Sequence, residues 1–94
     1  MVKFYPKKKT LGFHITVPEA NSVALVGDFN EWNEAANIMR KNKKGTWRAE
    51  IKLPGGEHQF RYLIDGNHWQ NDEECPTVLN DFGSENSVVY VKFD

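Results

Sequence analysis

Short runs of alternating apolar and polar residues, separated by turn residues, constrain this chain more than any other feature. Residues 47–53 (WRAEIKL) alternate, residues 58–65 (HQFRYLID) follow a similar pattern, and Pro-Gly-Gly lies between the two runs at 54–56. A two-residue repeat places successive side chains on opposite faces of a β-strand. Pro and Gly are typical turn residues. The pattern therefore predicts two strands joined by a turn.

Three further runs complete the expected sheet structure. Residues 13–17 alternate, residues 22–26 form an apolar run typical of a strand buried on both faces, and residues 87–93 are rich in valine. Strands at this spacing predict an all-β, antiparallel, Ig-like β-sandwich of about seven strands. Only residues 33–39 suggest a turn of helix. We expect residues 1–94 to form one domain.

Composition limits the possible functions. A chain of 94 residues buries about 60–65% of its unfolded surface, which leaves little room for a deep catalytic cleft. The formal net charge is −1, which favours neither nucleic acid nor an anionic membrane as a partner, and Lys7–Lys9 are expected to be a solvated edge. We expect a monomer without a nucleic-acid or membrane partner.

Cys75 is the single cysteine, so an internal disulfide is excluded and a reducing compartment fits best. The preceding acidic residues, Asp72–Glu74, should raise its pKa and leave the thiol inert. The N-terminal residues do not resemble a signal peptide, and no apolar run approaches the length of a membrane span. These features together predict a cytoplasmic location.

The three tryptophans occupy unequal positions. Trp47 belongs to an alternating run, where an inward-facing ring is expected. Trp32 and Trp69 follow segments rich in Gly, Asn and Asp, which are typical of turns. Large rings on polar loops are usually exposed and often indicate a binding surface. The alternative for Trp32 is a ring folded over the edge of the sandwich.

The polar residues do not indicate a catalytic or metal site. His14, His58 and His68 lack metal-ligand spacing, and the acidic cluster at 72–74 has no second carboxylate predicted opposite it. Glycoside hydrolysis requires two carboxyl groups on either side of one bond. We therefore predict a protein that is not an enzyme and uses no cofactor.

Two long segments resemble a known family. Residues 23–33 (VALVGDFNEWN) are similar to the V-x-G-x-F-N-x-W signature of family 48 carbohydrate-binding modules, and residues 53–66 (LPGGEHQFRYLIDG) match the family's second motif. Such modules occur in the beta subunit of AMP-activated protein kinase and at the N-termini of isoamylases, pullulanases and glycogen branching enzymes. The resemblance covers residues 11–91 and implies an early-set sandwich that binds glycogen or starch without catalysis.

The resemblance also implies roles for individual residues. Two tryptophans stack on glucose rings, a basic residue before the Asp-Gly turn binds the sugar, and a bulky residue with polar neighbours on a late loop completes the site. At the matching positions this chain has Trp32, Trp69, Arg61, Phe82, Ser84 and Asn86. Two departures stand out: His68 is an extra residue that is expected to re-aim Trp69, and Arg61 replaces the commoner lysine.

Elementary chemistry supports the same ligand. An α-linked glucose presents C–H groups to an indole face, and its hydroxyl rim pairs with the side chains of Arg61, Ser84 and Asn86, with Asn67 as a further candidate. Alternation places Arg61 on the outward face beside Leu63, which we expect to be exposed. An alternative function is docking onto a glucan-active enzyme or a kinase-like assembly. Exposed Leu63 and Phe82 and the lysine-rich N-terminus are equally compatible with that function.

The predicted site residues also have simpler interpretations. Arg61 can be an ordinary surface charge. Phe82 can close the end of the sandwich, and Asn86 can cap a turn instead of binding sugar.

Overall fold

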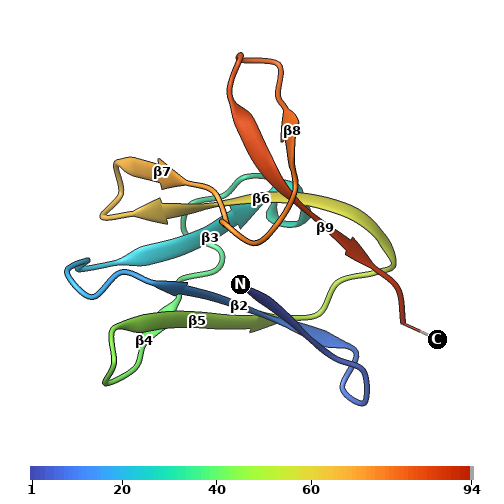
Figure 1. Ribbon diagram of the computed structural model, residues 1–94, viewed down its shortest axis with the longest axis horizontal. Coiled ribbons are helices and arrows are strands. Elements are labelled where there is room, and N and C mark those ends of the chain that lie inside the picture. Colours follow the sequence, from blue (N-terminus) through green and yellow to red (C-terminus); the bar gives the residue numbers. More distant parts are fainter. Residues whose placement is uncertain (94) are drawn as a thin grey trace.

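The computed structural model describes residues 1–93, which form two antiparallel sheets packed face to face (Figure 1). The first sheet has the order β1-β2-β5-β4. The second has the order β3-β6-β9-β8, with β7 also paired to β6. The strands are β1 (Val2–Tyr5), β2 (Thr10–Thr16), β3 (Val23–Gly27), β4 (Arg40–Lys41), β5 (Thr46–Ile51), β6 (Gly56–Ile64), β7 (His68–Gln70), β8 (Thr77–Leu79) and β9 (Glu85–Val91). The all-β prediction is confirmed, with nine strands in the described residues rather than about seven.

The five strands expected from sequence make the longest pairings of both sheets, with β3 at the edge of the second sheet. Each overlaps a predicted run: β2 with 13–17, β3 with 22–26, β5 with 47–53, β6 with 58–65 and β9 with 87–93. The additional strands β1, β4, β7 and β8 are two to four residues long and lie outside these five. Their brevity explains why periodicity did not indicate them.

The core lies between the sheets and is centred on aromatic rings. Phe13 of β2 meets Phe60 of β6 edge to face, with ring centres 4.9 Å apart. Trp47 is buried, as predicted, and its Nε1 donates to the carbonyl of Val17 at 3.1 Å. Each fully buried large apolar side chain contributes about 1.5–3 kcal/mol. This core joins the two sheets and fixes which side chains face outward.

The predicted helical turn at 33–39 is wrong. The only helical turn in the described residues is a 3-10 turn at Asp28–Asn30, directly after β3. Residues 37–39 instead run beside β3: Leu25 N donates to the Asn37 carbonyl and Met39 N donates to the Val23 carbonyl, both at 2.8 Å. Pairing with the edge of β3 and burial of Met39 hold this segment extended.

Strand β6 organises the second sheet. It pairs with β3 through residues 60–64, while β9 pairs with residues 56–60 and β7 with residues 62–64. Because β3 occupies one edge, β7 and β9 share the other edge. The β8–β9 hairpin projects from the sandwich, away from the first sheet (Figure 1). No helix in residues 1–93 has the length and apolar character to cross a bilayer.

Candidate functional site

A hollow of about 780 Å³ lies on the outer face of the second sheet. It is bounded by the 3-10 turn, β6, β7 and the β8–β9 hairpin. We call it the tryptophan hollow. It brings together all six residues predicted to form the site: Trp32, Arg61, Trp69, Phe82, Ser84 and Asn86. Asn67, the further candidate, is exposed on the β6–β7 turn and does not line the hollow.

Trp32 is held by an unusual backbone. Glu31 and Trp32 both have a φ of 57°, a left-handed conformation that is uncommon for side chains other than glycine or asparagine. Trp32 N donates to the carbonyl of Gly27 at 2.8 Å. Asn30 braces the loop, because its side chain accepts from Gly27 N and donates to the carbonyl of Leu25, each at 3.1 Å. These contacts leave Trp32 37% exposed at the rim of the hollow.

Trp69 lies on strand β7 and not on a loop, opposite Leu63 of β6. Its exposure is also 37%. The extra residue His68 pairs with Ile64, and the three-residue turn between them carries Asp65 and Gly66 with positive φ. The hairpin therefore absorbs His68, and Trp69 still lines the hollow. The expected re-aiming of this indole away from the site does not occur.

Arg61 packs against Trp69. Its guanidinium carbon lies 5.4 Å from the centre of the indole ring, within cation–π range. Its Nε is buried and has no hydrogen-bond partner in residues 1–93. Arg61 therefore supports the indole and lines the hollow beside it.

The prediction that Leu63 is exposed is wrong. Leu63 is buried and forms a small apolar cluster with Ala24 and Val26 of β3. Alternation assigned Leu63 to the correct face, because Ala24 pairs with Leu63 and Val26 with Arg61. The face is covered, however: β7 passes beside Leu63, and residue 38 bridges to Ala24. The three residues of this cluster do not line the tryptophan hollow.

A chain of side-chain amides connects the floor of the hollow to the β8–β9 hairpin. Asn86, predicted as a sugar contact, is buried at the lining of the hollow, and its Nδ2 donates to Gln59 Oε1 at 3.1 Å. Asn80 Nδ2 donates to Asn86 Oδ1 at 3.2 Å. Asn80 Oδ1 then accepts from the backbone N–H groups of Phe82 at 2.9 Å and Ser84 at 3.0 Å. Asn80 therefore caps the turn of the hairpin, and Asn86 braces it by linking Asn80 to Gln59.

Phe82 stands at the tip of this hairpin and is 94% exposed. It does not close the end of the sandwich, which was the alternative interpretation. Gly83 follows with a φ of 80°, a conformation that glycine adopts without strain. Phe82 shares the hollow with three other exposed apolar side chains, Trp32, Trp69 and Leu79, and a group of this kind is typical of a binding surface.

Sequence reasoning missed half of the residues that line the hollow. These are Asp28, Glu34, Gln59, Leu79, Asn80 and Asp81. Gln59 was recognisable from alternation, since it lies two residues before Arg61. Asp28 links two walls, because its Oδ2 accepts from Gln59 N at 3.1 Å. The others depend on how the hairpin folds over the sheet, which no local pattern encodes.

Cys75 lies outside the tryptophan hollow. Burial, together with the negative charge of Asp72, raises the pKa of its thiol to about 11. The expectation of an inert thiol with a raised pKa is supported, although burial is the larger cause. At neutral pH the sulfur is protonated and therefore a poor nucleophile.

Comparison with known proteins adds independent information. Residues 15–94 match the family described as the glycogen recognition site of AMP-activated protein kinase. Over 70 residues, 74% of this chain, the sequence is 36% identical to 5'-AMP-activated protein kinase subunit beta-1 of Sus scrofa, covering 54% of that protein. Over the same length it is 34% identical to subunit beta-1 of Rattus norvegicus and 31% identical to subunit beta-2 of Homo sapiens, covering 24% and 25% of those proteins. The chain thus spans about a quarter to a half of these relatives.

Proposed function

Because the chain belongs to the family of the AMP-activated protein kinase glycogen recognition site, we propose that it is a non-catalytic module that binds α-1,4-linked glucan through the tryptophan hollow. Glycogen, starch and maltodextrin are α-1,4-linked glucans of this kind. The observation that carries the proposal is the convergence of Trp32, Trp69 and Arg61 on one open hollow. These residues are separated in sequence, and only the folded sheet brings them together.

The chemistry of the hollow suits a neutral sugar chain. Each half-exposed indole can cover the C–H face of a glucose unit, which contributes on the order of 1 kcal/mol. Each hydrogen bond to a hydroxyl group adds about 0.5–1.5 kcal/mol net. Subtracting the several kcal/mol cost of association leaves a Kd of roughly tens of micromolar to millimolar for one short chain. A polymer with many overlapping sites binds with a higher apparent affinity.

The alternative function, docking onto an enzyme or kinase-like assembly, has lost part of its support. It relied on an exposed Leu63, and Leu63 is buried. Phe82 remains exposed, but it borders the tryptophan hollow and is explained by a glucan contact. The glucan proposal accounts for more of the exposed apolar residues on this face.

The three tryptophans provide a test with an internal control. Titration with maltoheptaose, followed in nitrogen–proton correlation spectra, should shift the indole signals of Trp32 and Trp69. The Trp47 signal should remain in place, because its N–H is bonded to Val17 inside the core. Three unshifted signals at millimolar sugar would exclude glucan binding, and equal shifts of all three would indicate a general change of structure.

A further inference from the structure

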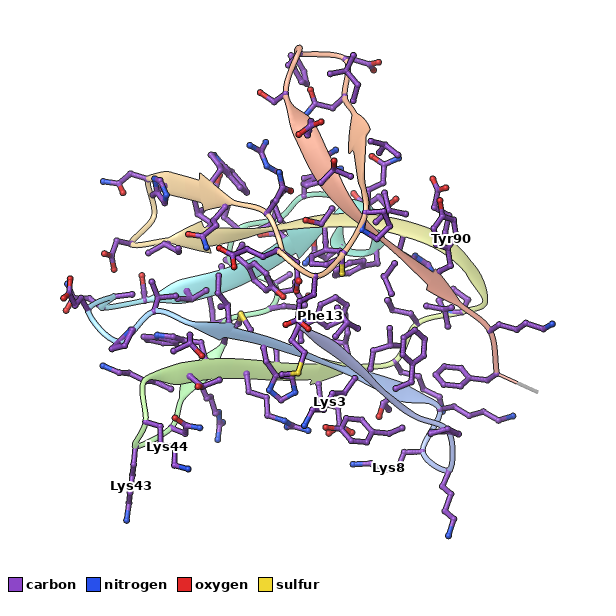
Figure 2. The ribbon with its side chains drawn as sticks, viewed as in Figure 1. Lys3, Lys8, Phe13, Lys43, Lys44 and Tyr90 are labelled. Atoms are coloured by element: carbon purple, nitrogen blue, oxygen red, sulfur yellow. The ribbon has the colours of Figure 1, made fainter. Side chains whose placement is uncertain are left out.

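Charge is segregated between the two sheets. All basic residues except Arg61 and Lys92 lie on the β1-β2-β5-β4 sheet, in its hairpin turns at 6–9 and 42–45, or directly after β5. Within these strands and hairpin turns, Glu50 is the only acidic residue. Figure 2 shows Lys3, Lys8, Lys43 and Lys44 along the same side of the molecule. We call the outer side of this sheet, with its two hairpin turns, the basic face.

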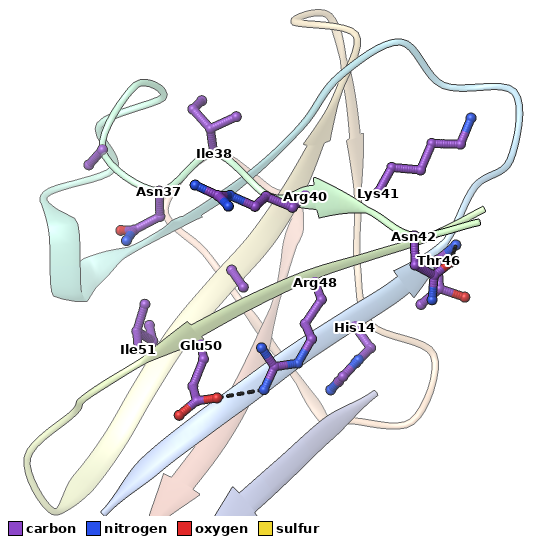
Figure 3. A pocket seen from close by; sticks show the side chains of 12 residues that line it. His14, Asn37, Ile38, Arg40, Lys41, Asn42, Thr46, Arg48, Glu50 and Ile51 are labelled. Atoms are coloured by element: carbon purple, nitrogen blue, oxygen red, sulfur yellow. Dashed lines mark hydrogen bonds and ion pairs between the residues drawn. The ribbon is translucent and has the colours of Figure 1, made fainter. Parts of the chain in front are cut away.

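Two like charges lie opposite one another on the basic face, because in the strand register Arg40 of β4 is opposite Arg48 of β5. On its other side Arg48 is opposite His14 of β2, whose pKa is lowered by burial and by the nearby cations, so that its ring is neutral at physiological pH. Figure 3 shows these three side chains around a hollow of about 560 Å³. Like charges directly opposite each other in a sheet are destabilising. An anionic partner would relieve this repulsion.

The single acidic residue balances only a small part of this charge. Glu50 accepts from Arg48 at 2.5 Å and pairs with Lys8 at 2.9 Å. Hydrogen bonds from Lys8, Thr10 and Arg48 hold the pKa of Glu50 at about 2, so it stays ionised. Lys8 is the only lysine of the two hairpin turns that forms an ion pair in residues 1–93, and Lys3 of β1 forms none.

The net charge of −1 hides this local field. The second sheet and its loops carry many acidic residues, among them Glu57, Asp81 and Glu85. Packed sheets lie about 10 Å apart, whereas the Debye length at physiological ionic strength is about 8 Å. A ligand that approaches the basic face through the electrolyte is therefore closest to the charges of that face and feels them most strongly. The expectation of no membrane partner was based on the net charge of the whole chain. A planar ligand contacts one outer face at a time, so the charge of that face is the relevant quantity.

We propose that the basic face binds the surface of an anionic phospholipid bilayer. Lysines at the two hairpin turns border a broad sheet surface, and clusters of this size attract anionic lipid. Among outward-facing residues of β1, β2 and β5, Tyr5 is the only Phe, Tyr or Trp. Its ring already lies 4.8 Å from Lys8 Nζ and 5.8 Å from Arg48 Cζ. Single-stranded nucleic acid requires free rings for stacking. Protein interfaces rely on several apolar anchors, whereas Ile38 is the only strongly exposed large apolar side chain among the described residues that line the hollow around Arg48, so lipid fits the surface better.

The orientation leaves the tryptophan hollow free. Strand β7 and the β8–β9 hairpin lie on the opposite side of the sandwich from the β4–β5 turn and the β1–β2 turn (Figure 1). A bilayer against the first sheet does not cover the second. The lipid proposal is independent of the glucan proposal, since each concerns a different face.

Sedimentation with vesicles tests the proposal. The chain should sediment with vesicles of phosphatidylcholine mixed with phosphatidylserine, and not with vesicles of phosphatidylcholine alone. Binding should disappear at about 1 M salt, where the Debye length is about 3 Å. The double variants Lys43→Gln/Lys44→Gln and Lys3→Gln/Lys7→Gln should each weaken partitioning by about five-fold for every lysine removed.

A matched control separates the basic face from net charge. The variant Asn67→Asp/Lys92→Gln changes the net charge by the same two units on residues outside the basic face, and both positions are exposed. It should bind vesicles like the unmodified chain. Equal weakening by this control, equal binding to neutral vesicles, or no binding at low salt would each overturn the proposal. Tighter retention on double-stranded RNA than on anionic vesicles would assign the face to nucleic acid instead.

Discussion

Replacing Trp69 with alanine should weaken glucan binding by an amount that its exposure sets. A tryptophan side chain offers up to about 250 Å², so an exposed fraction of 37% leaves on the order of 90 Å² for a sugar. At about 25 cal/mol/Å², covering all of this area contributes about 2 kcal/mol, and covering half contributes about 1 kcal/mol. The expected loss of affinity is therefore between about five-fold and about thirty-fold.

Isothermal titration calorimetry with maltoheptaose measures this loss directly. Trp32→Ala should give a loss in the same range, because its exposed fraction is the same. Trp69→Phe keeps a smaller flat ring and should fall between Trp69→Ala and the unmodified chain. Tyr90→Ala is the matched control, since Tyr90 is an exposed aromatic residue that does not line the hollow.

Because part of Trp69 is buried, Trp69→Ala can lose binding through unfolding as well as through loss of the stacking contact, and a measurement of the fold separates the two. Most of the ring packs on the sheet and Arg61, so Trp69→Ala is also expected to lower the unfolding temperature. Binding is therefore compared only where far-UV circular dichroism and the Trp47 indole signal show an intact fold. An unchanged Kd in folded Trp69→Ala would refute the stacking argument. So would an equal loss in Tyr90→Ala.

Other parts of the structure give further predictions. Asn80→Ala removes the acceptor for two backbone N–H groups and should mobilise the hairpin tip, with binding weakened about ten-fold; backbone relaxation and calorimetry check this. Tyr62→Phe removes the 2.7 Å bond to buried Asp72 and should lower the free energy of unfolding by about 1–3 kcal/mol in urea, whereas exposed Tyr90→Phe should not. Cys75, with its pKa raised to about 11, should resist a thiol reagent at pH 8 until urea unfolds the chain; rapid labelling of the folded chain would contradict this.

The central strands were predictable because local pattern and tertiary role agree in them. In β6 the inward residues Phe60 and Tyr62 alternate with Arg61, and burial on one face preserves that alternation. Trp47 was assigned to the core for the same reason. The prediction of a helical turn at 33–39 was wrong because pairing with β3 sets the conformation of this segment, and its own residues do not encode that contact.

The sequence indicated half of the residues that line the tryptophan hollow, but not the contacts among them. Family motifs identified the six residues, and folding brings all of them to one hollow. Burial of Leu63 and Asn86 was not predictable, since alternation assigns a residue to a face but not to the segments that cover it. Asn80 illustrates the same limit: an asparagine in a turn is common, but its bond to Asn86 exists only after the hairpin forms.

Charge at the two outer faces selects for different ligands. The tryptophan hollow contains one basic residue, Arg61, among the carboxylates of Asp28, Glu34 and Asp81. An anion entering this hollow meets net repulsion, whereas a neutral glucan does not, and its hydroxyl groups can donate to those carboxylates. The basic face has the opposite composition, with Glu50 alone among many cations. Because the two surfaces lie on opposite outer sides of the sandwich, one small chain can hold a neutral polymer on one side and an anionic surface on the other.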